Sequence, residues 1–226
     1  MIAPVRNLMI AALAMGLSAL GLSLVGLPHA AQAAKTDASE FSIAQIAAID
    51  QVSAYLNNIS TLKGDFVQTA PDGGITQGQF YIERPGRLRF EYAPPAQLQI
   101  VSDGLWVAVQ DKKLKTTEKY PLVTTPLKLI LGKDIDLMRD AKILAVFPEI
   151  DLVTVSIEEP TGEAPGTLTL MFDPVENRLT RWTVTDVQGL DTTVALENTV
   201  EGEPIDPLKF RIIEQRILDV GGNNTR

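Results

Sequence analysis

The sequence predicts a mainly β protein: one strongly curved antiparallel sheet of about eleven strands, with an N-terminal helix and a helical insertion. From Gly64 onward, short runs of alternating apolar and polar residues follow one another between turn sequences. The residues before them have apolar side chains at helical spacing. No internal repeat or linker divides the chain. We therefore expect a single domain whose helices cover the concave side of the sheet.

The N-terminal helix is expected over residues 41–56. Ser39 or Ser42 can cap its start, and the Asn57-Asn58 pair favours an end there. Its apolar side chains fall close to helical spacing, as one buried face requires; they are Ile43, Ile46, Ala47, Val52 and Leu56.

The clearest strands are residues 78–83 and 87–92, joined by a turn at Arg84-Pro85-Gly86. On the second of them, alternation places Leu88, Phe90 and Tyr92 on one face. One strand begins at Gly64. The other expected strands are residues 98–102, 105–110, 113–119, 152–158, 167–172, 179–186, 192–198 and 208–213.

Residues 120–147 interrupt this alternation. Thr125 as N-cap, Pro126 at the first helical position and Gly132 at the end predict one short helix, and residues 134–144 predict a second. The insertion has more apolar residues than a short surface helix needs, namely Leu127, Leu129, Ile130, Leu131, Ile135, Leu137 and Met138. Either these side chains pack on the sheet as an ordinary core, or they face a ligand.

Residues 1–33 have the features of a cleavable signal peptide. A single charge at Arg6 precedes an uncharged apolar run, and Ala31-Gln32-Ala33 has the small-x-small pattern of a cleavage site. We expect cleavage after Ala33 and a periplasmic location; an uncleaved anchor is the alternative. The mature domain would span residues 34–219, followed by a loose tail over 220–226.

The composition excludes several classes of protein. Arg6 is the only charged residue in residues 1–33, so the rest of the chain has 19 basic and 28 acidic residues. The resulting net charge of −9 disfavours nucleic-acid binding. There is no cysteine, and the single histidine, His29, lies in the signal segment. Thiol chemistry, Ser-His-Asp triads and histidine–metal sites are therefore excluded. Asp134-x-Asp136 and Glu158-Glu159 fit a helix first turn and a solvated strand end, so we expect neither an enzyme nor a cofactor.

Four segments in register resemble the family of periplasmic carriers of outer-membrane lipoproteins. The first two are Phe66-Val67-Gln68 and the run from Gln77 to Tyr92 through Arg84-Pro85-Gly86. The others are Ile100-Val101-Ser102-Asp103-Gly104 with Trp106, and Thr125-Pro126-Leu127 with Leu129-Ile130-Leu131. The resemblance in their order and spacing extends over residues 41 to about 213.

The resemblance implies a half-open barrel with a helical lid and an apolar cavity wide enough for acyl chains. Its cargo would be lipoproteins handed over by an inner-membrane ABC exporter. The resemblance does not decide whether an outer-membrane receptor takes part. We expect the carrier to be a monomer. Arg84 matches the arginine that holds the empty carrier shut. The residues expected to line the cavity are Leu88, Phe90, Trp106, Leu127, Leu129, Ile130, Leu131 and Met138.

Two alternatives keep this fold. One is a shuttle for free lipids such as glycolipids or hopanoid-like molecules, and the other is a lipid-sensing regulatory module, which usually has a second domain. The chain also departs from the family's Phe-x-Phe-x-Pro-Pro-x-Gly ending. Residues 210–216 have no such prolines, which puts the geometry of the last strand in doubt.

Overall fold

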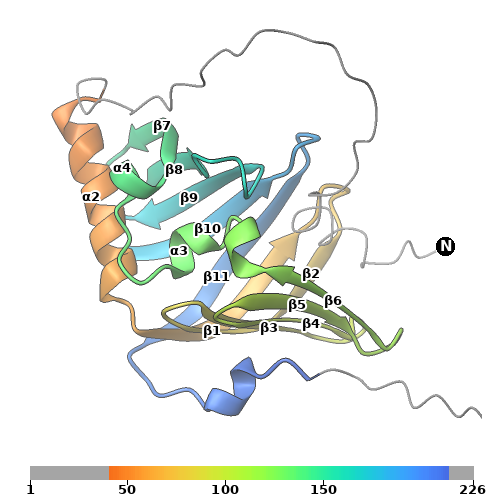
Figure 1. Cartoon of the computed structure of the whole chain (residues 1–226). Coiled ribbons are helices and arrows are strands. Elements are labelled where there is room, and N and C mark those ends of the chain that lie inside the picture. Colours follow the sequence, from red (N-terminus) through yellow and green to blue (C-terminus); the bar gives the residue numbers. More distant parts are fainter. Residues whose placement is uncertain (1–40, 214–226) are drawn as a thin grey trace, which may run out of the picture.

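The computed structural model describes residues 41–213 and is built on one open, curved antiparallel sheet of eleven strands (Figure 1). The expected signal segment and the C-terminal tail lie outside the described residues. The strands are β1 (Thr61–Thr69), β2 (Ile75–Glu83), β3 (Arg87–Tyr92), β4 (Leu98–Asp103), β5 (Trp106–Asp111), β6 (Thr116–Pro121), β7 (Lys142–Pro148), β8 (Val153–Glu158), β9 (Thr167–Asp173), β10 (Arg178–Thr185) and β11 (Asp191–Glu201). The mainly β, half-open fold expected from the sequence is confirmed.

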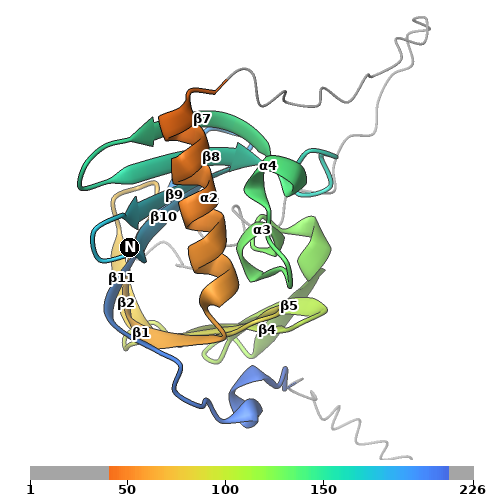
Figure 2. The ribbon, with the colours of Figure 1, turned by 90° about the vertical axis from the view of Figure 1, so that its left-hand side faces the viewer.

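The order of the strands explains why a lid exists. It runs β6-β5-β4-β3-β2-β1-β11-β10-β9-β8-β7, so β6 and β7 are the two edges of the sheet. Residues 122–141 connect these edges and must cross the open side; we call them the lid segment. It contains η2 (Leu122–Thr124), α3 (Lys128–Leu131) and α4 (Leu137–Asp140). Figure 2 shows α3 and α4 in the opening between the two wings of the sheet.

Helix α2 (Ile43–Asn58) lies beside the lid segment across the same opening (Figure 2). Its start is a capping box: the Ser42 hydroxyl accepts from the Gln45 N–H, and the Gln45 side chain accepts from the Ser42 N–H. The helix and its N-cap were predicted from the sequence within two residues at each end. The Gln45 side chain also donates to the Val146 carbonyl of β7 at 3.1 Å, which ties the helix to an edge strand.

The concave face is a wall of aromatic and aliphatic side chains. The Phe66 ring packs edge-on against Phe90 at 4.7 Å and against Tyr92 at 5.0 Å between centroids. Phe90 also contacts Phe80 at 5.9 Å and Trp182 at 6.0 Å. All five are buried. This face therefore offers a large hydrocarbon surface to whatever covers it.

Two predicted elements were wrong. Residues 142–144, expected to end a helix that begins at Asp134, belong to strand β7, and only residues 137–140 are helical before it. Conversely, residues 208–213 were expected to be a strand, but residues 207–210 form the 3-10 turn η3 (Pro207–Phe210). One missed strand and one extra strand cancel in the total of eleven.

Thr125 does not cap α3 as expected. Its hydroxyl donates to the Leu122 carbonyl at 2.8 Å, and the helix starts after Leu127, which has no side-chain capping bond. Asp136 caps the start of α4, where its carboxylate accepts from the Arg139 N–H.

The convex face has a different cover. Residues 203–213, which we call the strap, run over the outside of the sheet below β3 and β4 in Figure 1. The Phe210 side chain is buried there. Arg89 donates to the Lys209 carbonyl at 2.9 Å, and Gln110 donates to the Ile213 carbonyl at 2.6 Å. Within residues 41–213, no helix is long and apolar enough to cross a membrane.

Candidate functional site

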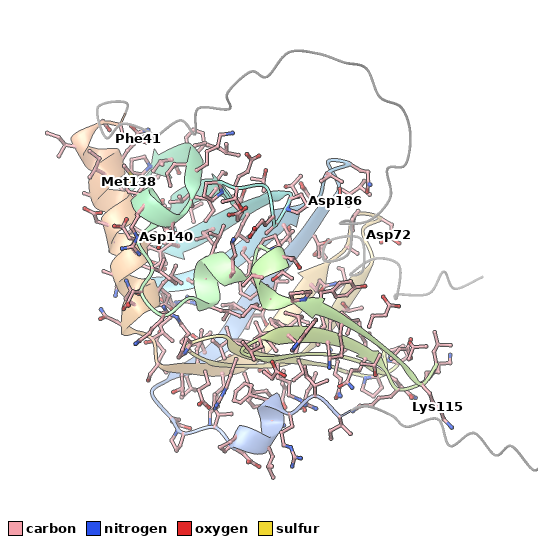
Figure 3. The ribbon with its side chains drawn as sticks, viewed as in Figure 1. Phe41, Asp72, Lys115, Met138, Asp140 and Asp186 are labelled. Carbon is pink, nitrogen blue, oxygen red and sulfur yellow. The ribbon has the colours of Figure 1, made fainter. Side chains whose placement is uncertain are left out.

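The lid segment turns its apolar residues inward. Six of the residues singled out for it from the sequence, namely Leu127, Leu129, Ile130, Leu131, Ile135 and Leu137, are buried and belong to the same core as the concave wall. Leu88 and Phe90 lie in that wall, on the inner side of β3. Met138 is partly buried, packed against the core, and lies beside α2 in Figure 3. The structure therefore brings together seven of the eight residues expected to line the cavity.

Trp106 is the exception. Val107 and Val109 of β5 are in the core, so Trp106 points to the convex side, where it is 42% exposed and lies under the Lys119 ammonium. The expectation that Trp106 lines the cavity is corrected. Trp182 of β10, 3% exposed and packed on Phe90, occupies the interior instead.

Little space remains beneath α3 in this conformation. An apolar cavity of about 20 Å³ remains between the lid segment, the end of α2 and the sheet; it is lined by Leu56, Ile59, Leu62, Ile82, Arg84, Ile130, Leu131, Leu179 and Trp182. That is about the size of one water molecule. Around it, side chains of the lid segment pack against the concave wall. Outward movement of the lid segment would open this part of the wall to hydrocarbon chains.

Arg84 ties the lid segment to the sheet. Its guanidinium, at the end of β2, donates from Nε to the Gly132 carbonyl at 3.2 Å, and its Nη2 donates to the same oxygen. Nη2 also lies 3.4 Å from the Lys133 carbonyl. These carbonyls follow α3, where the helix leaves its last acceptors unpaired and a cation is favourable. The arginine named from the resemblance is thus in contact with the lid.

Two residues near Arg84, whose contacts were not predicted from the sequence, add hydrogen bonds to the lid segment after α3. The Gly86 N–H, two residues after Arg84, donates to the Leu131 carbonyl at 2.8 Å. At the end of α2, the Asn57 amide donates to the Ile135 carbonyl at 2.7 Å and accepts from the Ile135 N–H at 2.9 Å. Asn57 was interpreted only as a helix end. Arg84 also donates to the Asn57 side-chain oxygen at 3.4 Å. Asn57 therefore connects α2, the lid segment and the turn after β2.

The other end of α3 has its own tie. The Lys128 ammonium lies 3.0 Å from a carboxylate oxygen of Glu159, whose side chain is 3% exposed. The same carboxylate accepts from the Thr161 N–H at 3.1 Å and the Glu163 N–H at 2.9 Å. Burial raises the pKa of Glu159, but the bonds from Lys128 and Thr161 outweigh it and lower this pKa to about 2. Glu159 was expected to be a solvated strand end and is instead a buried anchor for the lid.

A larger hollow lies on the convex face, where β1, β2 and β11 meet. It has a volume of about 310 Å³ and is lined mainly by polar and charged side chains, among them Lys63, Asp65, Gln79 and Asn198. Such a lining does not suit hydrocarbon. In the part of the chain that the structure describes, no cluster of three or more acidic or histidine residues is placed to hold a metal ion.

Comparison with known proteins points to one family. The model of the outer membrane lipoprotein carrier protein LolA matches residues 57–213. The chain is 32% identical to the outer-membrane lipoprotein carrier protein of Alkalilimnicola ehrlichii, over 92% of this chain and 95% of that protein. It is 27% identical to that of Chromobacterium violaceum, over 78% of this chain and 88% of that protein.

Among solved structures, a LolA superfamily protein from Nitrosomonas europaea is similar, with a TM-score of 0.45 and 9% identity over 76% of this chain and 99% of that one. The family match itself rests on the sequence. By that match, which takes in the Arg84 turn and the lid segment, the chain belongs to the outer membrane lipoprotein carrier protein LolA family.

Proposed function

We propose that this protein is a periplasmic carrier that shelters the acyl chains of lipoproteins between its lid segment and the concave wall. It would take them from an inner-membrane ABC exporter and deliver them to the outer membrane. One observation carries the proposal: an apolar lid lies on an apolar sheet and is held by polar contacts at the two ends of α3, Arg84 to Gly132 and Lys128 to Glu159.

The energetics favour exchange of the lid for hydrocarbon. Burial stabilises an acyl chain by about 0.8 kcal/mol per CH₂, so a sixteen-carbon chain gains about 12 kcal/mol on leaving water. The lid residues gain in the same way when they are closed. When lipid enters and the lid moves away, one apolar cover of the concave wall replaces another. The free-energy difference between the empty and the loaded state is therefore small enough for both loading and release.

In this mechanism the ties set the balance between the two states. A charge-assisted hydrogen bond contributes about 1.5–3 kcal/mol. That is enough to close an empty carrier and too little to oppose the burial of a whole chain. Arg84 is the latch of this mechanism. Leu88, Phe90, Trp182 and Met138 contact the chains once the lid has moved.

Native mass spectrometry of the protein purified from periplasm, followed by lipid extraction, tests the cargo. Co-purified intact lipoprotein is the expected result. Free glycolipid or hopanoid-like lipid would replace this proposal by the free-lipid shuttle, and a protein that never carries lipid would contradict both. The same spectra give the mature start, expected at Ala34, and the oligomeric state, expected to be a monomer.

A matched pair of variants locates the cargo. Ile130→Asp puts a charge on the buried face of the lid and is expected to abolish co-purification, whereas Leu208→Asp changes an exposed residue of the strap and is expected to leave it unchanged. Circular dichroism should show that both variants are folded. Equal loss in both would contradict binding beneath the lid.

A further inference from the structure

The turn between β5 and β6 is strongly basic, although the protein as a whole is acidic. Lys112, Lys113 and Lys115 follow one another closely there, whereas the chain has a net charge of −8. All three lysines are exposed, and Leu114 between them is 47% exposed. Figure 3 shows Lys115 at the outer end of this hairpin, far from α2 and α4. We call residues 112–115 the basic turn.

The lysines of the basic turn have no counter-charge. Within residues 41–213, no carboxylate forms an ion pair with any of the three. Other lysines are paired: the Lys128 ammonium lies 3.0 Å from Glu159, and that of Lys209 lies 3.1 Å from Glu91. The basic turn therefore presents three solvated ammonium groups that another molecule can contact.

The fold does not account for these side chains. Backbone donors hold the turn, since the Lys112 N–H donates to the Gln97 carbonyl and the Leu114 N–H to the Asp111 carboxylate, each at 2.8 Å. Lys115 has a φ of 55°, where glycine or asparagine is usual. Charge along an edge strand can prevent sheets from pairing. The three lysines, however, lie in the turn before the edge strand β6 and not along it.

The chemistry of the basic turn fits the surface of a membrane. Lysines near an anionic headgroup layer each strengthen binding about fivefold, and an apolar side chain among them can enter the interface. An acidic protein would attract the lysines as well, but it gives no reason for Leu114 to be exposed between them. A turn at the outer end of a hairpin can reach a flat surface and has no pocket for a small ligand.

We propose that the basic turn docks this protein on membranes that contain anionic phospholipid. The rest of the chain is acidic and is repelled by the same surface, so the contact is weak and turns the β5–β6 hairpin toward the membrane. This inference goes beyond the proposed cargo, because docking does not require an occupied cavity. A carrier that visits two membranes would approach both with the same end of its sheet.

The test measures sedimentation of the purified, empty protein with phosphatidylcholine vesicles, either pure or mixed with phosphatidylglycerol. The wild type is expected to bind the anionic vesicles and not the neutral ones. The triple variant Lys112→Gln/Lys113→Gln/Lys115→Gln should bind the anionic vesicles about a hundredfold more weakly, at about fivefold for each lysine. Added salt should also weaken wild-type binding, because it screens the charges.

A matched control separates the basic turn from net charge. Lys142→Gln/Arg178→Gln/Arg181→Gln removes the same number of charges from β7 and β10, in the other wing of the sheet, and should bind anionic vesicles as the wild type does. Equal weakening in both triple variants would overturn the basic turn as the docking site. Thermal melting should show that both variants are folded. If the variant of the basic turn is not, Lys113→Gln alone should still weaken binding about fivefold.

The remaining outcomes separate docking from the carrier function. A wild type that does not bind anionic vesicles would overturn membrane docking and leave an acidic protein as the partner of the basic turn. The carrier function would still stand if intact lipoprotein co-purifies with the protein. Equal binding to neutral and anionic vesicles would also overturn the proposal, since it would show uptake of lipid or apolar adsorption instead of charge recognition.

Discussion

Both faces of the sheet are covered by a segment of the chain, but the two covers are held in different ways. On the concave side, the lid segment contributes a row of apolar side chains, and among its polar contacts are those at the ends of α3 and those of Ile135 with Asn57. On the convex side, Arg89 and Gln110 hold the strap through the Lys209 and Ile213 carbonyls. Gln99 joins these two side chains within the sheet, because Arg89 donates to Gln99 at 2.7 Å and Gln99 donates to Gln110 at 2.6 Å. Phe210 is the apolar anchor of the strap.

The difference shows which cover hydrocarbon can displace. An acyl chain can replace the apolar lid contacts almost one for one, since burial of hydrocarbon has no direction. It cannot replace the bonds from Arg89 and Gln110 to the strap, because these require peptide carbonyls at fixed positions. We therefore expect the lid to move during transport and the strap to stay in place.

The largest expected effect separates the stability of the strap from lipid binding. Phe210→Ala removes the anchor of the strap and should lower the free energy of unfolding by about 3–5 kcal/mol. Its affinity for acyl chains should be unchanged, because the concave wall is untouched. Urea titration and displacement of a fluorescent apolar probe measure the two quantities. Loss of lipid binding while the protein is still folded would show that the two faces are coupled.

A smaller effect is expected at the latch. Arg84→Leu removes the bonds to Gly132 and places an apolar side chain at the cavity, so it should favour the open, loaded state by about 1.5–3 kcal/mol. The variant should fold, accept cargo and fail to release it in transfer between donor and acceptor membranes. Arg87→Leu is the control, since Arg87 pairs with Glu83 at 2.8 Å away from the lid. Normal release by Arg84→Leu would remove its role as a latch.

The smallest effect is at the other end of α3. Lys128 is partly exposed, so Lys128→Met should destabilise the closed lid by about 1 kcal/mol. Hydrogen exchange of the α3 amides should then quicken about fivefold relative to the wild type. Unchanged exchange would make the Lys128–Glu159 pair irrelevant to lid closure.

Acidification tests the same pair. Because the folded state lowers the pKa of Glu159 to about 2, its contribution is complete above the unfolded pKa, about 4.5, and is lost as the pH falls toward 2. Glu159→Gln should show a smaller loss of stability in that window than the wild type. Identical acid unfolding curves for the two proteins would contradict a stabilising carboxylate.

The sequence predicted the helix and most strands because each has one buried face, but β7 was missed for a specific reason. A bulge between Ile143 and Ala145 places the buried Ile143 and Val146 three residues apart, which is helical spacing. The strap was missed because its backbone bonds go to side chains of β3 and β5, which local alternation does not encode.

The site was predictable where it depends on side-chain type and not where it depends on tertiary contacts. The apolar excess of the lid is visible in the sequence, and Arg84 was found through the family resemblance. Asn57 and Glu159 are ordinary polar residues until α2 and the loop after β8 meet the lid. Trp106 was placed on the wrong face because both faces of β5 are buried, so alternation does not tell inside from outside.

The two tryptophans of the chain offer the most direct test, because Trp182 lies inside the sheet and Trp106 outside it. Trp106→Phe and Trp182→Phe each leave a single fluorophore, to be titrated with a diacyl lipid brominated along its chains, which quenches on contact. Acyl chains beneath the lid should quench Trp182 in Trp106→Phe and leave Trp106 bright in Trp182→Phe. Quenching of Trp106 alone, or equal quenching of both, would contradict binding between the lid and the concave wall.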